Sequence, residues 1–143
     1  MKRFFYFLLL FTVFFSCDRD TQTDNNNPYL PNYSFEVILN MSFPQYSVLA
    51  YPSSAVFVNS AGAGIRGLIV FNAGSGNFLA YDAACPNQTL ADCSTMTING
   101  INAKCPCDDA EYSLFTGLAA GKQYPMKVYR VQMIDATTIK VYN

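Results

Sequence analysis

Hydrophobic residues are distributed in three regimes along the 143-residue chain. An apolar run covers residues 4–15, a wholly polar stretch covers residues 18–27, and short apolar segments alternate with turn residues from Tyr29 onward. Apolar residues nowhere recur at helical spacing over three turns, so the pattern predicts an all-β domain. The candidate strands are residues 35–39, 46–50, 55–58, 67–72, 77–82, 95–98, 101–104, 111–115, 126–133 and 138–142.

Two turn signals join neighbouring candidate strands into hairpins. Residues 73–76, Ala-Gly-Ser-Gly, separate one pair of strands, and Asn99-Gly100 separates another. Asn-Gly is the strongest short hairpin signal, because both residues tolerate positive φ. We expect at most one turn of helix, around residues 89–93.

The N-terminus resembles a bacterial lipoprotein signal. Met1-Lys2-Arg3 is basic, the following apolar run is too short for a stable membrane span, and Ser16 precedes Cys17. We therefore predict a signal peptide over residues 1–16, an acylated Cys17 followed by a polar tether over residues 17–28, and one domain over residues 29–143. Multiple acyl chains would hold the protein stably on a membrane. The acidic start of the tether favours the outer membrane, with the domain either periplasmic or surface-exposed.

The charge balance argues against nucleic acid as a partner. Without the two basic signal residues, seven basic residues face ten acidic ones, a net charge of −3. No basic stripe exists to displace counterions.

Four cysteines remain in the predicted domain: Cys85, Cys93, Cys105 and Cys107. An exported chain passes through an oxidising compartment, so these thiols are expected to form disulfides, in any of three pairings. The alternative is that four thiolates hold zinc or a two-iron cluster, with Asp108 as an oxygen ligand. Asn87 is a poor ligand, however, and oxidation competes with metal binding, so we expect no metal.

Two loops of the chain open with Cys-Pro. Cys85-Pro86-Asn87 follows a strand, and residues 105–117, Cys-Pro-Cys-Asp-Asp-Ala-Glu-Tyr-Ser-Leu-Phe-Thr-Gly, contain the second loop, an aromatic strand and a Thr-Gly turn. This order, with Tyr124-Pro125-Met126 and a closing hairpin, resembles the Rieske iron–sulfur domain family over residues 33–143. The resemblance implies small antiparallel sheets with both cysteine loops at one tip.

In that family each loop supplies one cysteine and one histidine to a [2Fe–2S] cluster. The histidine positions correspond to Asn87 and Asp108 here, beside the ligand cysteines Cys85 and Cys105, and the chain has no histidine. A Rieske centre needs two imidazoles on one iron. The resemblance therefore implies a degenerate member with vestigial cluster positions and no expected cofactor; an atypical [2Fe–2S] cluster is the alternative.

The resemblance also implies a disulfide pairing. Two sulfurs that would share one iron lie close enough to oxidise, which pairs Cys85 with Cys105. Some family members carry a second bridge between the loops, and Cys107 matches one half of it. The resemblance implies Cys93 as the other half. In sequence, however, Cys93 lies farther from Cys85 than the spacing found in the family.

No catalytic group is signalled. Without histidine, a serine or cysteine nucleophile would need a lysine or carboxylate beside it, and none is indicated. The sequence favours a lipid-anchored envelope protein that serves as a disulfide-stabilised interaction or structural module, with an envelope protein as partner. The alternative is electron transfer through an atypical cluster or through thiol–disulfide chemistry.

Overall fold

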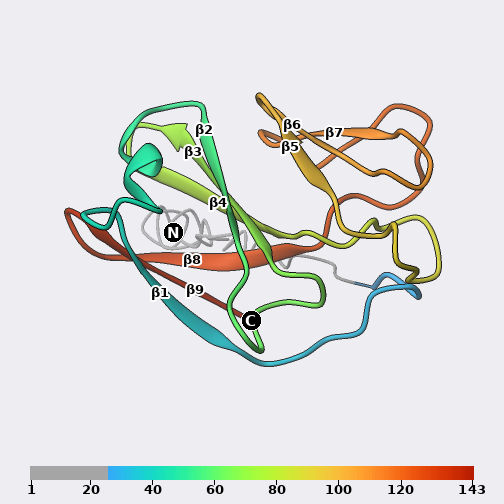
Figure 1. Ribbon diagram of the computed structural model, residues 1–143, viewed down its shortest axis with the longest axis horizontal. Coiled ribbons are helices and arrows are strands. Elements are labelled where there is room, and N and C mark those ends of the chain that lie inside the picture. Colours follow the sequence, from blue (N-terminus) through green and yellow to red (C-terminus); the bar gives the residue numbers. More distant parts are fainter. Residues whose placement is uncertain (1–25) are drawn as a thin grey trace, which may run out of the picture.

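The computed structural model describes residues 26–143, so the predicted signal peptide and Cys17 lie outside the described residues. Nine strands and one short 3-10 helix make up the described part (Figure 1). Their bounds are β1 Glu36–Asn40, η1 Ser47–Ala50, β2 Ser54–Val58, β3 Leu68–Gly74, β4 Asn77–Asp82, β5 Thr97–Asn99, β6 Asn102–Lys104, β7 Glu111–Ser113, β8 Val128–Asp135 and β9 Thr138–Tyr142. The prediction of an all-β fold is confirmed, and no helix of the described segment is long and apolar enough to span a bilayer.

The strands form two antiparallel sheets. Six of them pair in the order β1-β9-β8-β4-β3-β2, and β5-β6-β7 form a smaller sheet. Only two residue pairs join β4 to β8, at Ala80 with Tyr129 and Tyr81 with Val128. In Figure 1 the strands β2–β4 lie above β1, β8 and β9, and the smaller sheet stands apart at one end. The larger sheet is therefore two three-stranded halves joined at one narrow seam.

Strand β3 is buried on both faces, which explains its continuous apolar run. Leu68 and Val70 point into one core together with residues of β1, β8 and β9. Ile69 and Phe71 point into a second core beneath the smaller sheet. Because successive side chains of a strand point to opposite faces, a strand between two cores needs apolar residues at every position.

Both predicted hairpins are present. The β3–β4 hairpin turns at Ser75 and Gly76, which both have positive φ. The β5–β6 hairpin pairs Asn99 with Asn102, so its turn residues are Gly100 and Ile101 and lie one position later than predicted. Only Gly100 has positive φ, at 61°, as a type II′ turn requires of its first central residue.

One local prediction is wrong. Residues 46–50 do not form a strand: Ser47–Ala50 is a 3-10 helix whose backbone bonds are local, such as Leu49 N to the Tyr46 carbonyl at 3.0 Å. Leu49 is buried there, and its carbonyl accepts the amide of Asn72. Residues 89–93, where at most one helical turn was expected, form a loop without helix. The other nine strands lie within two residues of their predicted ends.

Candidate functional site

The two Cys-Pro loops each begin where a strand ends. Strand β4 ends at Asp82 and leads into Cys85, whose backbone N–H donates to the Ser94 carbonyl at 2.8 Å. Strand β6 ends at Lys104, and the N–H of Cys105 donates to the Ala110 carbonyl at 2.9 Å. The second loop is therefore closed at its base by its own backbone, and both loops start from fixed positions.

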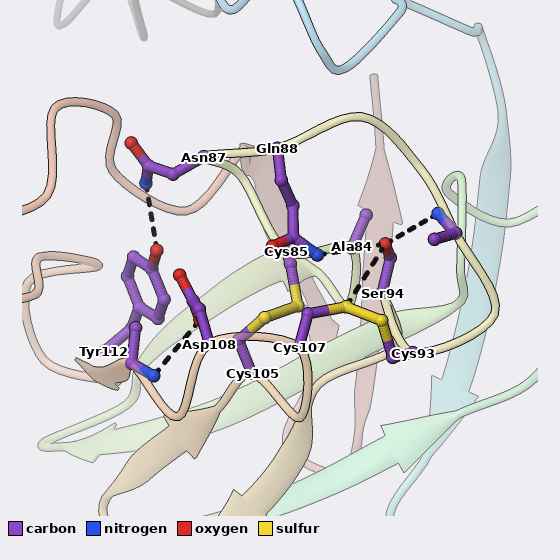
Figure 2. Close-up of a disulfide and its surroundings, with 12 residues drawn as sticks. Ala84, Cys85, Asn87, Gln88, Cys93, Ser94, Cys105, Cys107, Asp108 and Tyr112 are labelled. Carbon is purple, nitrogen blue, oxygen red and sulfur yellow. Dashed lines mark hydrogen bonds between the residues drawn. A yellow bond between two sulfur atoms is a disulfide. The ribbon is translucent and has the colours of Figure 1, made fainter.

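Two disulfides join these loops at one tip of the domain (Figure 2). Cys85 is bonded to Cys105 with a Cα–Cα distance of 5.6 Å, and Cys93 is bonded to Cys107 at 5.2 Å. These are the pairs that the resemblance implies. The inner bridge is buried, with both cysteines 1% exposed, whereas Cys93 is exposed and Cys107 is half-buried. The prediction that the loops lie side by side is confirmed.

Asn87, at the first expected histidine position, uses its side chain to hold the segment 123–124 and to contact Tyr112. Its Nδ2 donates to the Tyr124 carbonyl at 2.7 Å and to the Tyr112 hydroxyl at 2.9 Å. Its Oδ1 accepts from the backbone N–H groups of Gln123, at 3.1 Å, and Tyr124, at 2.9 Å. Four contacts saturate an amide group, so this side chain has no spare donor or acceptor.

Asp108, at the second expected histidine position, binds the same segment through Lys122. The Lys122 Nζ lies 2.5 Å from Oδ2 of Asp108, while the N–H of Ala110 donates to Oδ1 at 3.2 Å. Desolvation alone would raise the pKa of Asp108, but the hydrogen bonds from Lys122 and Ala110 outweigh it and hold the pKa below its usual value. Both positions thus clamp residues 122–124 over the loops.

Tyr112 of β7 connects this clamp to the core. Its ring is fully buried, and its hydroxyl accepts the Asn87 amide. Burial raises the pKa of the phenol above its ordinary value, against the opposing effect of the Asn87 hydrogen bond. The hydroxyl therefore stays neutral at physiological pH and positions Asn87.

The residues at the four positions that the resemblance assigns to cluster ligands do not fit a Rieske cluster. Two imidazoles are required, and the chain has none. Asn87 is saturated by protein groups, Asp108 is committed to Lys122, and the sulfurs of Cys85 and Cys105 are bonded to each other. The Sγ atoms of Cys85, Cys105 and Cys107 do lie within 4.8 Å of one another, so these three sulfurs form one cluster.

The neighbouring carboxylates do not act as a group. Asp109 pairs with Lys104 at 2.8 Å, and Glu111 accepts the side-chain amides of Asn99 and Asn102. Each carboxylate therefore has a separate partner within the protein.

Sequence reasoning missed Asp82, a buried carboxylate under the first loop. It accepts the N–H of Ala84 at 2.7 Å, the N–H of Ile65 at 2.5 Å and the hydroxyl of Tyr129 at 2.6 Å. Burial, together with the adjacent Asp82 charge, raises the pKa of Tyr129. Asp82 thus fixes the start of the first cysteine loop to the glycine-rich segment 62–67. Nothing in the local sequence signals these partners, because Ile65 and Tyr129 are distant along the chain.

No protein-family model matches the sequence, and no curated protein matches it. Solved structures do match in shape. A chain of the complex of reduced oxygenase and oxidized ferredoxin in carbazole 1,9a-dioxygenase is 22% identical, with 76% of this chain and 92% of that chain covered and a TM-score of 0.48. The similarity is one of fold.

Two further structures are similar at lower identity. The ferredoxin of carbazole 1,9a-dioxygenase from Nocardioides aromaticivorans is 16% identical, covering 77% of this chain and 97% of that chain at a TM-score of 0.47. The E. coli protein NirD is 14% identical, covering 78% and 98% at a TM-score of 0.46.

Proposed function

We propose that the protein is exported and lipid-anchored in the cell envelope, where its degenerate Rieske-like domain serves as a disulfide-stabilised interaction or structural module and not as an enzyme. One observation carries this proposal. Asn87 and Asp108, at the expected histidine positions, both bind residues 122–124: three of the four Asn87 side-chain hydrogen bonds go to Gln123 and Tyr124, and Asp108 pairs with Lys122. Side chains that already bind residues 122–124 are not available to a cofactor, and their contacts hold the two cysteine loops and this segment in one fixed arrangement.

The two disulfides support a structural role. They close loops of 20 and 14 positions in sequence separation. In the chain-entropy model each such bridge stabilises the fold by about 3 kcal/mol. In a small domain, whose core buries limited apolar area, such cross-links supply stability that a larger core would otherwise provide.

The start of the described chain supports an orientation toward the membrane. The Asn27 side chain donates to the Pro86 carbonyl at 2.7 Å, and Tyr29 packs edge-on against Tyr124 with ring centroids 6.0 Å apart. The ten residues from Asp18 to Asn27, which follow an acylated Cys17, would reach at most about 35 Å when fully extended. The disulfide tip would then lie near the lipid surface, where an envelope partner would meet it.

The test is the composition of the full chain purified in detergent without reductant. We expect a colourless protein without stoichiometric iron, whose mass is four hydrogens lower than that of its reduced form. Cross-linked peptides should join Cys85 to Cys105 and Cys93 to Cys107. Four free thiols together with iron and acid-labile sulfide would overturn the structural role and support electron transfer through an atypical cluster.

A further inference from the structure

The two disulfides differ in their exposure to solvent, and their sulfur atoms lie close to one another. Cys93 is exposed, so an external thiol can reach the outer bridge, while the inner bridge is buried. Cys107, the other half of the outer bridge, has its Sγ within 4.8 Å of both inner sulfurs. Thiol–disulfide exchange requires access at the first sulfur and proximity at the next, and this arrangement supplies both.

Ser94 lies beside Cys107, and its other contacts leave its hydroxyl hydrogen free to point at the Cys107 sulfur. Its Oγ accepts the N–H of Ala91 at 2.8 Å and the Nε2 of Gln88 at 3.3 Å. The remaining contact is Cys107 Sγ at 3.8 Å, and a disulfide sulfur carries no hydrogen, so Ser94 is the donor (Figure 2). A hydrogen bond to a leaving sulfur stabilises the thiolate that forms when the bond breaks.

We propose that Cys107 is a shared sulfur that forms a disulfide with Cys93 in one state and with Cys85 in the other. External thiols would reduce the outer disulfide at Cys93, and Cys107 would then replace Cys105 as the disulfide partner of Cys85. This activity goes beyond the structural role proposed above. It requires only the four sulfurs and does not depend on the lipid anchor.

The exchange balances in three steps. An external thiolate attacks Sγ of Cys93, forms a mixed disulfide there and expels Cys107 as a thiolate. Cys107 then attacks Sγ of Cys85, so that a Cys85–Cys107 bond forms and Cys105 leaves. A second thiol resolves the mixed disulfide at Cys93. Two external thiols become one disulfide, and their protons end on Cys93 and Cys105.

Attack on Cys85 is favoured over attack on Cys105. Only Pro106 separates Cys105 from Cys107, and a disulfide across one residue closes a small, strained ring. The bond that crosses between the two loops is therefore kept in either state, as Cys85–Cys105 or as Cys85–Cys107. The loops stay joined while the redox state changes.

The test uses the full-length Cys93→Ser variant, which leaves Cys107 without its outer partner. The folded protein is equilibrated, quenched in acid, unfolded and alkylated with N-ethylmaleimide while still acidic, because Cys105 is buried in the folded state. It is then mapped without reduction, with fragment-ion sequencing to separate Cys105 from Cys107. We expect label on both Cys107 and Cys105, and a Cys85–Cys107 cross-link. The matched control is Cys107→Ser, in which only Cys93 should be labelled. Label confined to Cys107 in the first variant would overturn the proposal.

The wild-type protein gives a second test that does not depend on a variant folding. It is treated with dithiothreitol at less than one equivalent, equilibrated and alkylated in the same way. We expect molecules in which Cys93 and Cys105 carry label while Cys85 remains cross-linked to Cys107. Molecules labelled only at Cys93 and Cys107, at every degree of partial reduction, would show two independent bridges and contradict the shared sulfur.

Ser94 acts through Cys107 as a positioning residue. Adding Ser94→Ala to Cys93→Ser should slow the alkylation of Cys107 several-fold, because the thiolate loses its donor. Adding Ser94→Ala to Cys107→Ser should leave the alkylation rate of Cys93 unchanged. Equal slowing of alkylation at Cys107 and at Cys93 would mean that Ser94 only supports the loop structure, and would contradict its role as a hydrogen-bond donor to Cys107.

Discussion

Asn87 donates a 2.9 Å hydrogen bond to the buried hydroxyl of Tyr112, and this contact connects the first cysteine loop to strand β7. The same amide holds the backbone of Tyr124 from both sides, by donating to its carbonyl and accepting from its N–H. One short side chain therefore links three segments that are distant in sequence, which makes it the centre of the tip.

Asn87→Ala is predicted to destabilise the domain by about 2 kcal/mol, because several polar groups lose their partner at once. Urea unfolding of the full chain measures the change. Asn87→Asp retains the acceptor oxygen and should cost less. The matched control is Asn143→Ala, since the Asn143 amide makes one exposed contact, to the Tyr33 carbonyl. An equal cost at positions 87 and 143 would contradict the clamp.

Asp108 is predicted to make the stability of the domain sensitive to acid. Its folded pKa is lower than its unfolded pKa, so the unfolded chain binds more protons and stability falls as pH drops below about 4. Asp108→Asn should flatten this dependence in urea unfolding measured between pH 7 and pH 3. At pH 7 its cost should be below about 1 kcal/mol, as for partly exposed ion pairs.

The partner residue provides the control for this acid dependence. Lys122→Ala should flatten the same part of the profile, and combining it with Asp108→Asn should add little. Some dependence will remain from Asp135, whose pKa is lowered by hydrogen bonds from Thr137 and Thr138. A Lys122→Ala profile identical to that of the wild type would show that the ion pair does not set the acid response.

The strand pattern was predictable because each sheet buries particular faces. The run over Leu68–Phe71 of β3 is apolar at every position since it lies between two cores, and the glycines at 76 and 100 lie in the hairpin turns. The prediction failed at residues 46–50, where apolar Val48 and Leu49 resemble a strand. Local i to i+3 hydrogen bonds satisfy that backbone instead.

The site was predictable in its cysteines but not in its polar contacts. The Cys-Pro repeats indicate two loops that meet. The partners of Asn87, however, lie 25 to 37 positions away, and Lys122 lies 14 positions from Asp108. Such contacts depend on how the closing segment folds over the tip, which no local pattern encodes. The same holds for Asp82, 47 positions from Tyr129.

Cys17→Ser is predicted to release the protein from membranes or to block its processing. The basis is the basic start, the apolar run and the polar stretch after Cys17. Two acyl chains are needed for stable anchoring, and a serine cannot carry them by this route. Fractionation of cells that express either form measures the effect. A variant that partitions with membranes like the wild type would show that the anchor lies elsewhere.

The inner disulfide is predicted to contribute more stability than the outer one. Both bridges close loops of similar length, 20 and 14 positions, so chain entropy gives each about 3 kcal/mol. Cys85 and Cys105 are also packed in the core with Met96, Tyr112 and other apolar residues, whereas Cys93 is exposed. Replacing both inner cysteines with alanine should therefore cost about 1 kcal/mol more than replacing both outer ones, because a small cavity opens.

Urea unfolding of the two double variants without reductant compares them, and each retains one intact bridge. Equal losses would mean that the core around the inner sulfurs collapses fully, and a larger loss for the outer pair would contradict the inner bridge as the main cross-link.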